Sequence, residues 1–298
     1  MKIFRILSAA IFFTASGLSA QITQRIHTGN DTINSIISDI DSIIFNTIDS
    51  KMKVLLPGQD CGLMVNLGEI SKVTFNGSFS NDISASCGSP NVHKSGINYG
   101  SLTDQQGNVY KTVVIGGKEW MAENLKTNVY RNGDAIPNIT DVQSWQGTSS
   151  GAWVHYSGSS QNDCPYGKLY NWRAVSDSRN LCPAGWHVPS DIEWRALEDS
   201  LGGAQVAGQK LKSMVLRYWQ CPNDFSDNSS GFSGLPGGGR IIFGGYYQAG
   251  FKGWWWTSTQ LDANLAYYRE LDYNQPSVYR NGDGTDKQHG LSVRCMKD

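Results

Sequence analysis

The residues of this chain that could carry chemistry are its cysteines, histidines and serines, and their spacing builds none of the common catalytic sites. No two of the six cysteines form a C-x-x-C pair, which disfavours both a zinc site and a thioredoxin-type redox centre. The string GTSSG at 147–151 matches the G-x-S-x-G pattern of hydrolases. That pattern needs a tight strand-to-helix turn, whereas this string lies in a polar stretch. We therefore expect a protein without enzymatic activity.

The histidines lead to the same expectation. His187 stands four residues before Asp191, between Trp186 and Val188, a setting that favours a packed side chain over a general base. No H-E-x-x-H string is present, so the helical zinc-protease motif is absent. The other four histidines have neither a carboxylate nor a cysteine at ligand spacing: His27, His93, His155 and His289.

The start of the chain predicts a secretory signal peptide over residues 1–20. Lys2 and Arg5 precede a mostly apolar run at 6–13, and the segment ends in Leu18-Ser19-Ala20, which is typical of a cleavage site. This run is shorter than the ~20 residues that span a bilayer, and no later stretch is long and apolar enough. We expect an exported protein, in the periplasm, on the outer cell surface or secreted, with no transmembrane segment in the mature chain.

In an exported chain, an even number of cysteines favours disulfides. Sequence alone leaves their connectivity open. Assigned by region of the chain, the expected bonds are Cys61–Cys87, Cys164–Cys221 and Cys182–Cys295.

Composition indicates two regions and excludes one class of partner. The 298 residues include 33 Gly, 10 Trp, 13 Tyr and 10 Phe, but only 17% are charged, against about 25% in an ordinary domain. The 25 Lys and Arg against 26 Asp and Glu leave no positive excess, so no nucleic-acid partner is expected. No tryptophan precedes Trp120. We expect a small β-rich N-terminal region with a connector at 21–96 and a larger domain at 97–298.

The larger region alternates short strands with two helices, which indicates an α+β fold. One helix is expected to begin at Ser190, with Glu193 as its capping-box partner. A second helix is expected over 204–214, with Val206, Leu211 and Met214 on its inner side. Short strands are expected at 110–115, 240–243, 254–258, 266–271 and 291–295, and in the N-terminal region at 33–45 and 72–75.

Six ordered motifs cover about residues 100–298 and carry a resemblance to a known family. They are GGKEWMAENLKT at 116–127, YGKLYNW at 166–172, CPAGWHVPSDIEW at 182–194, GFSGLPGGGR at 231–240, WTST at 256–259 and GLSVRC at 290–295. In this order and spacing they resemble the Fibrobacter succinogenes major paralogous domain (FISUMP) family of exported bacterial proteins. The string SDIDSIIF at 38–45 is similar to a segment frequent near the start of exported Bacteroidota proteins.

The resemblance implies a fold and two alternative functions. The family is similar to C-type lectin-like domains and to the formylglycine-generating enzymes, which implies two helices on short antiparallel strands with long loops on one face. One alternative is an oxidase of the formylglycine-generating type. Those enzymes use two cysteines a few residues apart, whereas the nearest pair here, Cys164 and Cys182, lies eighteen residues apart. The other alternative is a purely structural component of the cell envelope.

Aromatic residues crowd the late part of the chain, interleaved with Asp and Asn. Flat rings stack on sugar faces and anchor protein contacts, so we expect a binding or adhesion module for a glycan or a surface protein. In a strand, Trp255 would lie on the face opposite Trp254 and Trp256. The resemblance places Trp254 and Trp256 in the core, so we expect Trp255 to be the exposed tryptophan. The expected ligand-binding residues are Tyr246, Tyr247, Trp255, Tyr267, Tyr268, Asp272, Tyr273, Asn274 and Tyr279.

No cofactor is expected, and calcium is the alternative because many lectin-like domains use it. Its oxygen ligands would come from Asn281, Asp283, Thr285 and Asp286, although their spacing is not that of an EF-hand. The preceding string QPS at 275–277 has a serine where the "QPD" sugar motif of calcium-dependent lectins has its ligating acid.

Overall fold

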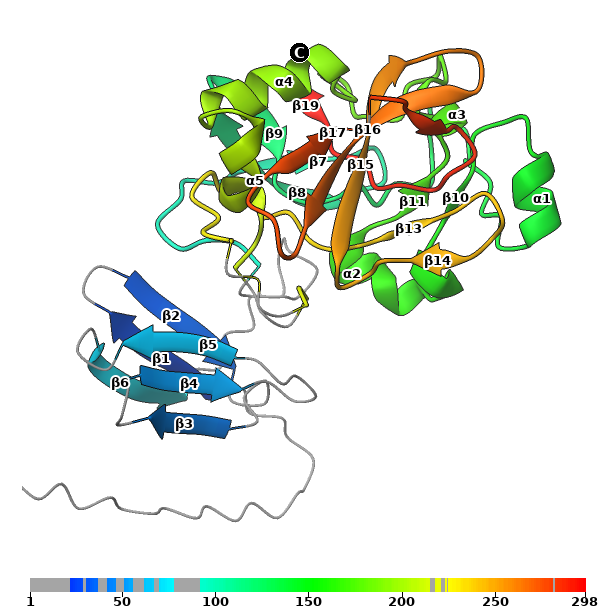
Figure 1. The fold of residues 1–298 in the computed structure, drawn as a ribbon. Coiled ribbons are helices and arrows are strands. Elements are labelled where there is room, and N and C mark those ends of the chain that lie inside the picture. The colour runs from blue at the N-terminus through cyan, green and yellow to red at the C-terminus, as the bar shows by residue number, and fades with distance from the viewer. Residues whose placement is uncertain are drawn as a thin grey trace, which may run out of the picture.

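The computed structural model of the chain describes residues 22–28, 31–36, 42–46, 51–55, 62–66, 70–77 and 92–298, apart from 215–217, 221–222, 224 and 281. Within residues 22–77 the described segments are strands of two antiparallel sheets, with the orders β2-β1-β6 and β3-β4-β5 (Figure 1). Their bounds are β1 Ile22–Thr28, β2 Asp31–Ile36, β3 Ser42–Asn46, β4 Lys51–Leu55, β5 Gly62–Asn66 and β6 Ile70–Gly77.

Several expectations lie outside the described residues. These are the signal peptide over 1–20, most of the connector that precedes residue 97, and three of the six cysteines, Cys61, Cys87 and Cys221.

A five-stranded antiparallel sheet joins the beginning of the larger region to its end. Its order is β12-β19-β9-β8-β7, so β19, at the end of the chain, lies between the early strand β9 and β12 from the middle; Figure 1 labels β7, β8, β9 and β19. Both ends of the region are therefore held in one sheet. The bounds are β7 Gly100–Thr103, β8 Val109–Ile115, β9 Lys118–Met121, β12 Trp186–His187 and β19 Met296–Lys297.

A second, curled antiparallel sheet carries the late aromatic residues. Strands β15, β16 and β17 lie in this order, and β18 pairs with the start of β16. Single bridges from Trp255 to Ser292 and from Leu291 to Tyr170 extend it toward the β10–β11 pair. The bounds are β10 Trp153–Val154, β11 Leu169–Tyr170, β13 Gly239–Arg240, β14 Tyr246–Tyr247, β15 Lys252–Gln260, β16 Leu265–Asp272, β17 Val278–Arg280 and β18 Thr285–Asp286.

Two expected strands are shorter than the sequence suggests. Strand β13 ends at Arg240 because the chain turns directly after it, with the Ile241 amide donating to the Gly245 carbonyl and the Gly244 amide to the Ile241 carbonyl. Residues 291–295 form isolated bridges rather than a continuous strand, and the regular pairing begins only at Met296.

Helix α4 begins as its local sequence predicts. Ser190 accepts a hydrogen bond from the Glu193 amide while the Glu193 carboxylate accepts from the Ser190 amide, which satisfies two donors that a helix start otherwise leaves unpaired. The helices of the region are α1 Val142–Gly147, α2 Asp163–Tyr166, α3 Trp172–Val175, α4 Asp191–Ser200 and α5 Ala204–Leu211, with single 3₁₀ turns at Tyr156–Gly158 and Ser160–Asn162.

Helix α5 differs from the expectation in its length and in its inner side. It ends at Leu211, and Val206 and Met214 are 41% and 48% exposed rather than buried. Its covered side is formed by Ala207, Gly208 and Leu211, because the helix lies so close to the loop before β17 that a Cβ on Gly208 would meet the carbonyl oxygen of Ser277 at 2.2 Å.

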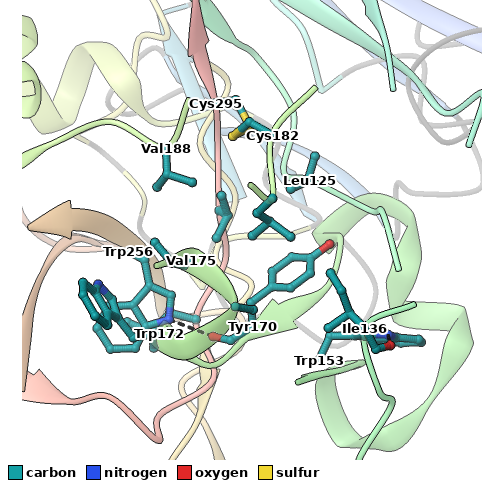
Figure 2. Close-up of a cluster of buried hydrophobic side chains, with 14 of the residues drawn as sticks. Leu125, Ile136, Trp153, Tyr170, Trp172, Val175, Cys182, Val188, Trp256 and Cys295 are labelled. Atoms are coloured by element: carbon teal, nitrogen blue, oxygen red, sulfur yellow. Dashed lines mark hydrogen bonds between the residues drawn. A yellow bond between two sulfur atoms is a disulfide. The ribbon is translucent and has the colours of Figure 1, made fainter. Parts of the chain in front are cut away.

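The core consists of two main clusters of buried side chains, one on each side of β15. One cluster contains Tyr170, Trp172 and Trp256 (Figure 2), and the other contains Trp194 of α4 and Trp255. No helix of the described residues is long and apolar enough to cross a membrane.

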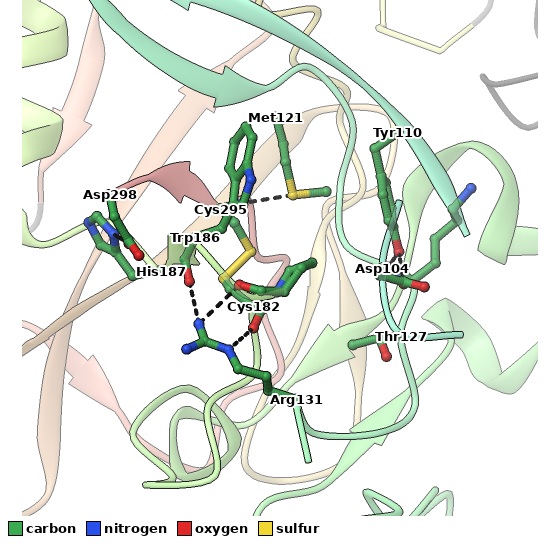
Figure 3. Close-up of a disulfide and its surroundings, with 12 residues drawn as sticks. Asp104, Tyr110, Met121, Thr127, Arg131, Cys182, Trp186, His187, Cys295 and Asp298 are labelled. Atoms are coloured by element: carbon green, nitrogen blue, oxygen red, sulfur yellow. Dashed lines mark hydrogen bonds and ion pairs between the residues drawn. A yellow bond between two sulfur atoms is a disulfide. The ribbon is translucent and has the colours of Figure 1, made fainter. Parts of the chain in front are cut away.

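A disulfide joins Cys182 to Cys295 across 113 residues, which confirms that expected pair. The Arg131 guanidinium lies against it and donates to the carbonyls of Cys182, Pro183 and Trp186 (Figure 3). Cys164 is also disulfide-bonded.

Candidate ligand-binding face

Trp255 lies on the inner side of β15, so the expectation that it is exposed is wrong. It is 1% exposed, and its Nε1 donates a 2.8 Å hydrogen bond to Asn124 Oδ1. The cluster around it includes Trp194 of α4 and Leu211 of α5, which shows that the two helices cover this side of the sheet. Alternation correctly separates Trp255 from its two neighbours, but the side that remains accessible is the one that carries Trp254.

The Trp254 side of the sheet changes from core to surface along the strands. Trp256 is fully buried, whereas Trp254, two residues earlier, is partly buried. Glu270 lies directly opposite Trp254, and Tyr279 lies directly opposite Glu270 on the next strand. Since residues of equal parity share one side of a strand, we define the Trp254 face by Lys252, Trp254, Tyr268, Glu270, Asp272 and Tyr279.

Hydrogen bonds and ion pairs fix the polar groups of this face. Trp254 Nε1 donates to Glu270 Oε2 at 2.7 Å. Lys252 Nζ lies 2.5 Å from Glu270 Oε1 and 3.1 Å from Asp272 Oδ2. Burial lowers the pKa of Lys252, but its bonds to Glu270 and Asp272 outweigh that effect and raise it overall. The ammonium therefore remains charged, and the face presents a cation between two carboxylates.

Glycine 239 gives Trp254 the space that its ring needs. A Cβ on Gly239 would lie 2.5 Å from Cε3 of the indole, a separation that side chains do not adopt. The ring thus lies directly against the backbone of β13. Within the glycine-rich string at 237–239, Gly239 therefore supports the Trp254 ring.

Three of the expected binding residues belong to this face and the others lie elsewhere. Tyr268, Asp272 and Tyr279 are members, and Tyr279 is 52% exposed. Tyr267 lies on the opposite side of β16, where the Arg280 guanidinium covers its ring at 4.3 Å. Asn274 is exposed in the turn after β16, with its amide bonded to Asp272 Oδ1.

The remaining expected aromatic residues form two further groups. Tyr246 packs edge-to-face against Tyr156, while its strand neighbour Tyr247 is 48% exposed. Tyr273 packs edge-to-face against Phe251. The late aromatic residues are therefore spread over separate parts of the surface rather than gathered in one pocket.

The oxygen atoms suggested for calcium are used within the protein where they are described. Thr285 Oγ1 lies 2.7 Å from His289 Nδ1, and Asp286 Oδ1 accepts from the Gln288 amide. Asp283 also has an interaction partner, and Asn281 lies outside the described residues. Across the described part of the chain, no group of three or more His, Cys, Asp or Glu side chains is arranged to hold a metal ion.

A lysine ammonium group bonds to the oxygen atoms of the loop between β15 and β16. Lys287 Nζ donates to the carbonyls of Asp262 and Ala263 and to Gln260 Oε1, at 2.7, 3.0 and 2.9 Å. It also lies 4.5 Å from the centre of the Trp172 ring. This ammonium group satisfies loop oxygens that would otherwise face one another unpaired.

Three members of the Trp254 face are not among the binding residues expected from the sequence: Lys252, Trp254 and Glu270. The resemblance places Trp254 in the core, and Lys252 and Glu270 are not aromatic, although both lie among the late aromatic residues. The available signal was the strand period itself, because Lys252 and Trp254 alternate along one strand, and Glu270 lies at even spacing between Tyr268 and Asp272 on the next.

The described part of residues 92–298 defines the class of protein: it is a disulfide-bonded α+β domain. Two helices cover one side of its curled antiparallel sheet, and the other side carries an aromatic and charged face. Residues 113–297 match the family model described as the Fibrobacter succinogenes major domain, and the chain belongs to this family. No curated protein and no solved structure matches the chain.

Proposed function

We propose that this domain is an adhesion module that binds a glycan, and that the Trp254 face is where the glycan binds. The observation that carries the proposal is the fixed arrangement of Trp254, Glu270, Lys252 and Asp272 next to the exposed ring of Tyr279. The apolar C–H faces of a sugar stack on such rings. Its hydroxyl groups donate to carboxylates and accept from an ammonium group.

The arrangement also favours binding on energetic grounds. The carboxylate of Glu270 already has one partner on each oxygen, so its rotamer is set before a ligand arrives. Little side-chain entropy is then lost on binding. A carboxylate oxygen has more than one acceptor position, so it can accept from a ligand hydroxyl group in addition to its existing partner.

The finer features expected from the sequence belong to the same proposal. They are a C-type lectin-like fold related to the formylglycine-generating enzymes, export across the membrane of a Bacteroidota-type cell, and a place in the periplasm, on the cell surface or outside the cell. What supports a binding module over the oxidase alternative is that Cys164, Cys182 and Cys295, the cysteines within the described residues, are all disulfide-bonded.

The test is a glycan array probed with the full chain, followed by affinity measurements on any glycan that binds. Tyr279→Ala removes the exposed ring, and Glu270→Gln removes the central charge. We expect each change to weaken binding by about tenfold or more, the loss typical of a central contact residue. Ile192→Ala, at a side chain on α4 that is 76% exposed, is the matched control and should bind normally.

Two outcomes would overturn this proposal. One is a glycan that binds equally well to Tyr279→Ala and Glu270→Gln but not to Tyr247→Ala, which would move the site to β14. The other is an array without binding, combined with capture of a protein from surface extracts that Tyr279→Ala abolishes; this would make the ligand a surface protein.

A further inference from the structure

Tyr247 lies on a surface that continues the Trp254 face beyond β15. It pairs directly with Gly239 across the antiparallel strands β13 and β14, and directly opposed residues have their side chains on the same side of such a pair. That side of β13 faces Trp254, because a Cβ on Gly239 would lie 2.5 Å from Cε3 of its indole. β13 is itself joined to β15 by a bridge between Gly238 and Gly253. Tyr247 and the Trp254 ring therefore lie on one side of β13.

The next pair of residues on the same two strands supports this placement. Arg240 lies directly opposite Tyr246, and its guanidinium carbon is 5.5 Å from the centre of the Tyr246 ring. Tyr246 also packs edge-to-face against Tyr156. Since successive residues of a strand point to opposite sides, Tyr247 points away from this packed group, in agreement with its exposure of 48%.

In the other direction, the face continues from Trp254 to Tyr279. Trp254, Glu270 and Tyr279 lie opposite one another on β15, β16 and β17. Because neighbouring strands are about 4.8 Å apart, the positions of Trp254 and Tyr279 are separated by about 10 Å. Tyr247, Trp254 and Tyr279 thus form a row of three rings that crosses the strands from β14 to β17, which we call the aromatic row.

The charges beside the aromatic row are balanced. Lys252 pairs with the carboxylates of Glu270 and Asp272. The buried Lys212 Nζ donates to the carbonyl oxygen of Asp272 at 2.7 Å. Burial lowers the pKa of Lys212 to about 8, so this ammonium group is still charged at neutral pH. Two ammonium groups therefore stand against two carboxylates, and a charged ligand gains little net attraction here.

The Tyr247 end of the row carries no charge. Residues 241–251, which cover β14, the turn before it and the approach to β15, have the sequence IIFGGYYQAGF without a charged side chain. The stretch 142–162, which supplies Tyr156, also lacks Asp, Glu, Lys and Arg. Rings among uncharged amide and hydroxyl groups stack on sugar faces and bond to sugar hydroxyls without selecting a charge.

We propose that the ligand is a neutral polysaccharide whose chain lies across the strands along the aromatic row, with several sugar units bound at once. This extended site depends on the glycan function proposed for the Trp254 face and names the class of glycan. A row that runs from β14 to β17 is longer than one sugar ring, so the interior of a chain can contact all three rings. A single terminal sugar would leave Tyr247 without a role.

The test measures the affinity of the full chain for disaccharides and hexasaccharides of the cellulose, xylan and chitin types, by calorimetry. We expect at least one series to bind, with its hexasaccharide held at least about tenfold more tightly than its disaccharide. Because no net charge is involved, sodium chloride at about 0.5 M should leave the affinity unchanged. Polygalacturonate, an acidic polysaccharide, should not compete.

Two variants locate the ends of the bound chain. Tyr247→Ala should weaken hexasaccharide binding about tenfold while the disaccharide binds as before, whereas Tyr279→Ala should weaken both. Tyr247→Phe retains the ring and is the matched control, which should bind both normally. Tyr247 is 48% exposed and Tyr279 is 52% exposed, so the variants should remain folded, and their thermal midpoints check this.

The outcomes separate the extended site from the Trp254 face itself. Equal affinity for the disaccharide and the hexasaccharide, or full binding of the hexasaccharide by Tyr247→Ala, would overturn the extended site while a loss in Tyr279→Ala upholds the Trp254 face. Tyr279-dependent binding of polygalacturonate alone, weakened by salt, would overturn the neutral class of ligand. Absence of any glycan binding that Tyr279→Ala weakens would overturn both proposals.

Discussion

Trp254 Nε1 on β15 donates to Glu270 Oε2 on β16, and the two residues lie directly opposite each other across the strands. On the other side of β15, the indole of Trp255 donates to Asn124 deep in the core. Adjacent tryptophans thus have different roles. The Trp255 bond satisfies a buried polar atom, whereas the Trp254 bond orients a carboxylate at the edge of the surface.

Trp254→Phe should weaken ligand binding while preserving the fold. Phenylalanine retains the apolar contact with Gly239 but has no donor for Glu270, whose side chain is only 10% exposed. Loss of one partner of a largely buried carboxylate costs about 1–3 kcal/mol of stability. We expect glycan affinity to fall about tenfold as well. Phe243→Leu, at a side chain that is 75% exposed, should change neither quantity when both are measured by calorimetry and urea unfolding.

Gly239→Ala should displace the Trp254 ring, because the added methyl carbon would lie 2.5 Å from the indole. Either the strand pair β13–β14 or the ring must shift, at a cost of about 1–3 kcal/mol for overpacking. Tryptophan fluorescence and urea unfolding measure the two effects. Gly147→Ala is the control, because a Cβ there would meet nothing within 4 Å; equal responses of the two variants would contradict the packing argument.

Asp191→Asn should destabilise the domain strongly. Asp191 Oδ1 lies 2.8 Å from Arg269 Nη1 and 2.8 Å from Arg280 Nε, and the Arg269 side chain is 0% exposed. Removing the charge leaves Arg269 with Glu198 as its remaining carboxylate, and breaking a buried pair of this kind costs about 3–5 kcal/mol. Urea unfolding provides the measurement. Asp134→Asn, which breaks an exposed pair with Arg179, should leave the unfolding midpoint almost unchanged.

The sequence predicts best those features whose determinants are local. The capping box of Ser190 and Glu193 joins residues only three positions apart, and its prediction is confirmed. The exposure expected for Trp255 is wrong, because strand alternation determines which residues share a side of the sheet but not which side the helices cover. The burial expected for Val206 is also wrong. Which side of α5 is covered depends on the close approach of this helix to Ser277, and that contact is set by tertiary packing. The contact of His93 with Glu123 could not be predicted, since the two residues, 30 positions apart, meet only when residues 92–99 dock on the domain.

Replacing Cys182 and Cys295 together by alanine should lower stability substantially. The bond closes a loop of 113 residues, and in the chain-entropy description a loop of that length contributes about 4–5 kcal/mol by restricting the unfolded chain. Urea unfolding of the double variant should show a lower midpoint. Because Cys164 is bonded elsewhere, the comparison must be made without a reducing agent; an unchanged midpoint would show that the hydrogen bonds of Arg131 alone hold this junction.

Stability should decrease as the pH falls from neutral to mildly acidic. Burial lowers the pKa of His93 and of His289 below the ordinary value of 6.5. The unfolded chain therefore binds protons at these positions before the folded chain does, and stability is fully present above pH 6.5 and is lost as the pH falls toward the lowered values. Each group contributes at most about 1.4 kcal/mol per pH unit within that window. Urea unfolding over a pH series measures the decline, which His93→Gln and His289→Gln should each make less steep. A stability that rises on acidification would contradict this, because it would mean that the attraction of Glu123 and Asp286 outweighs burial and raises the pKa of the two histidines.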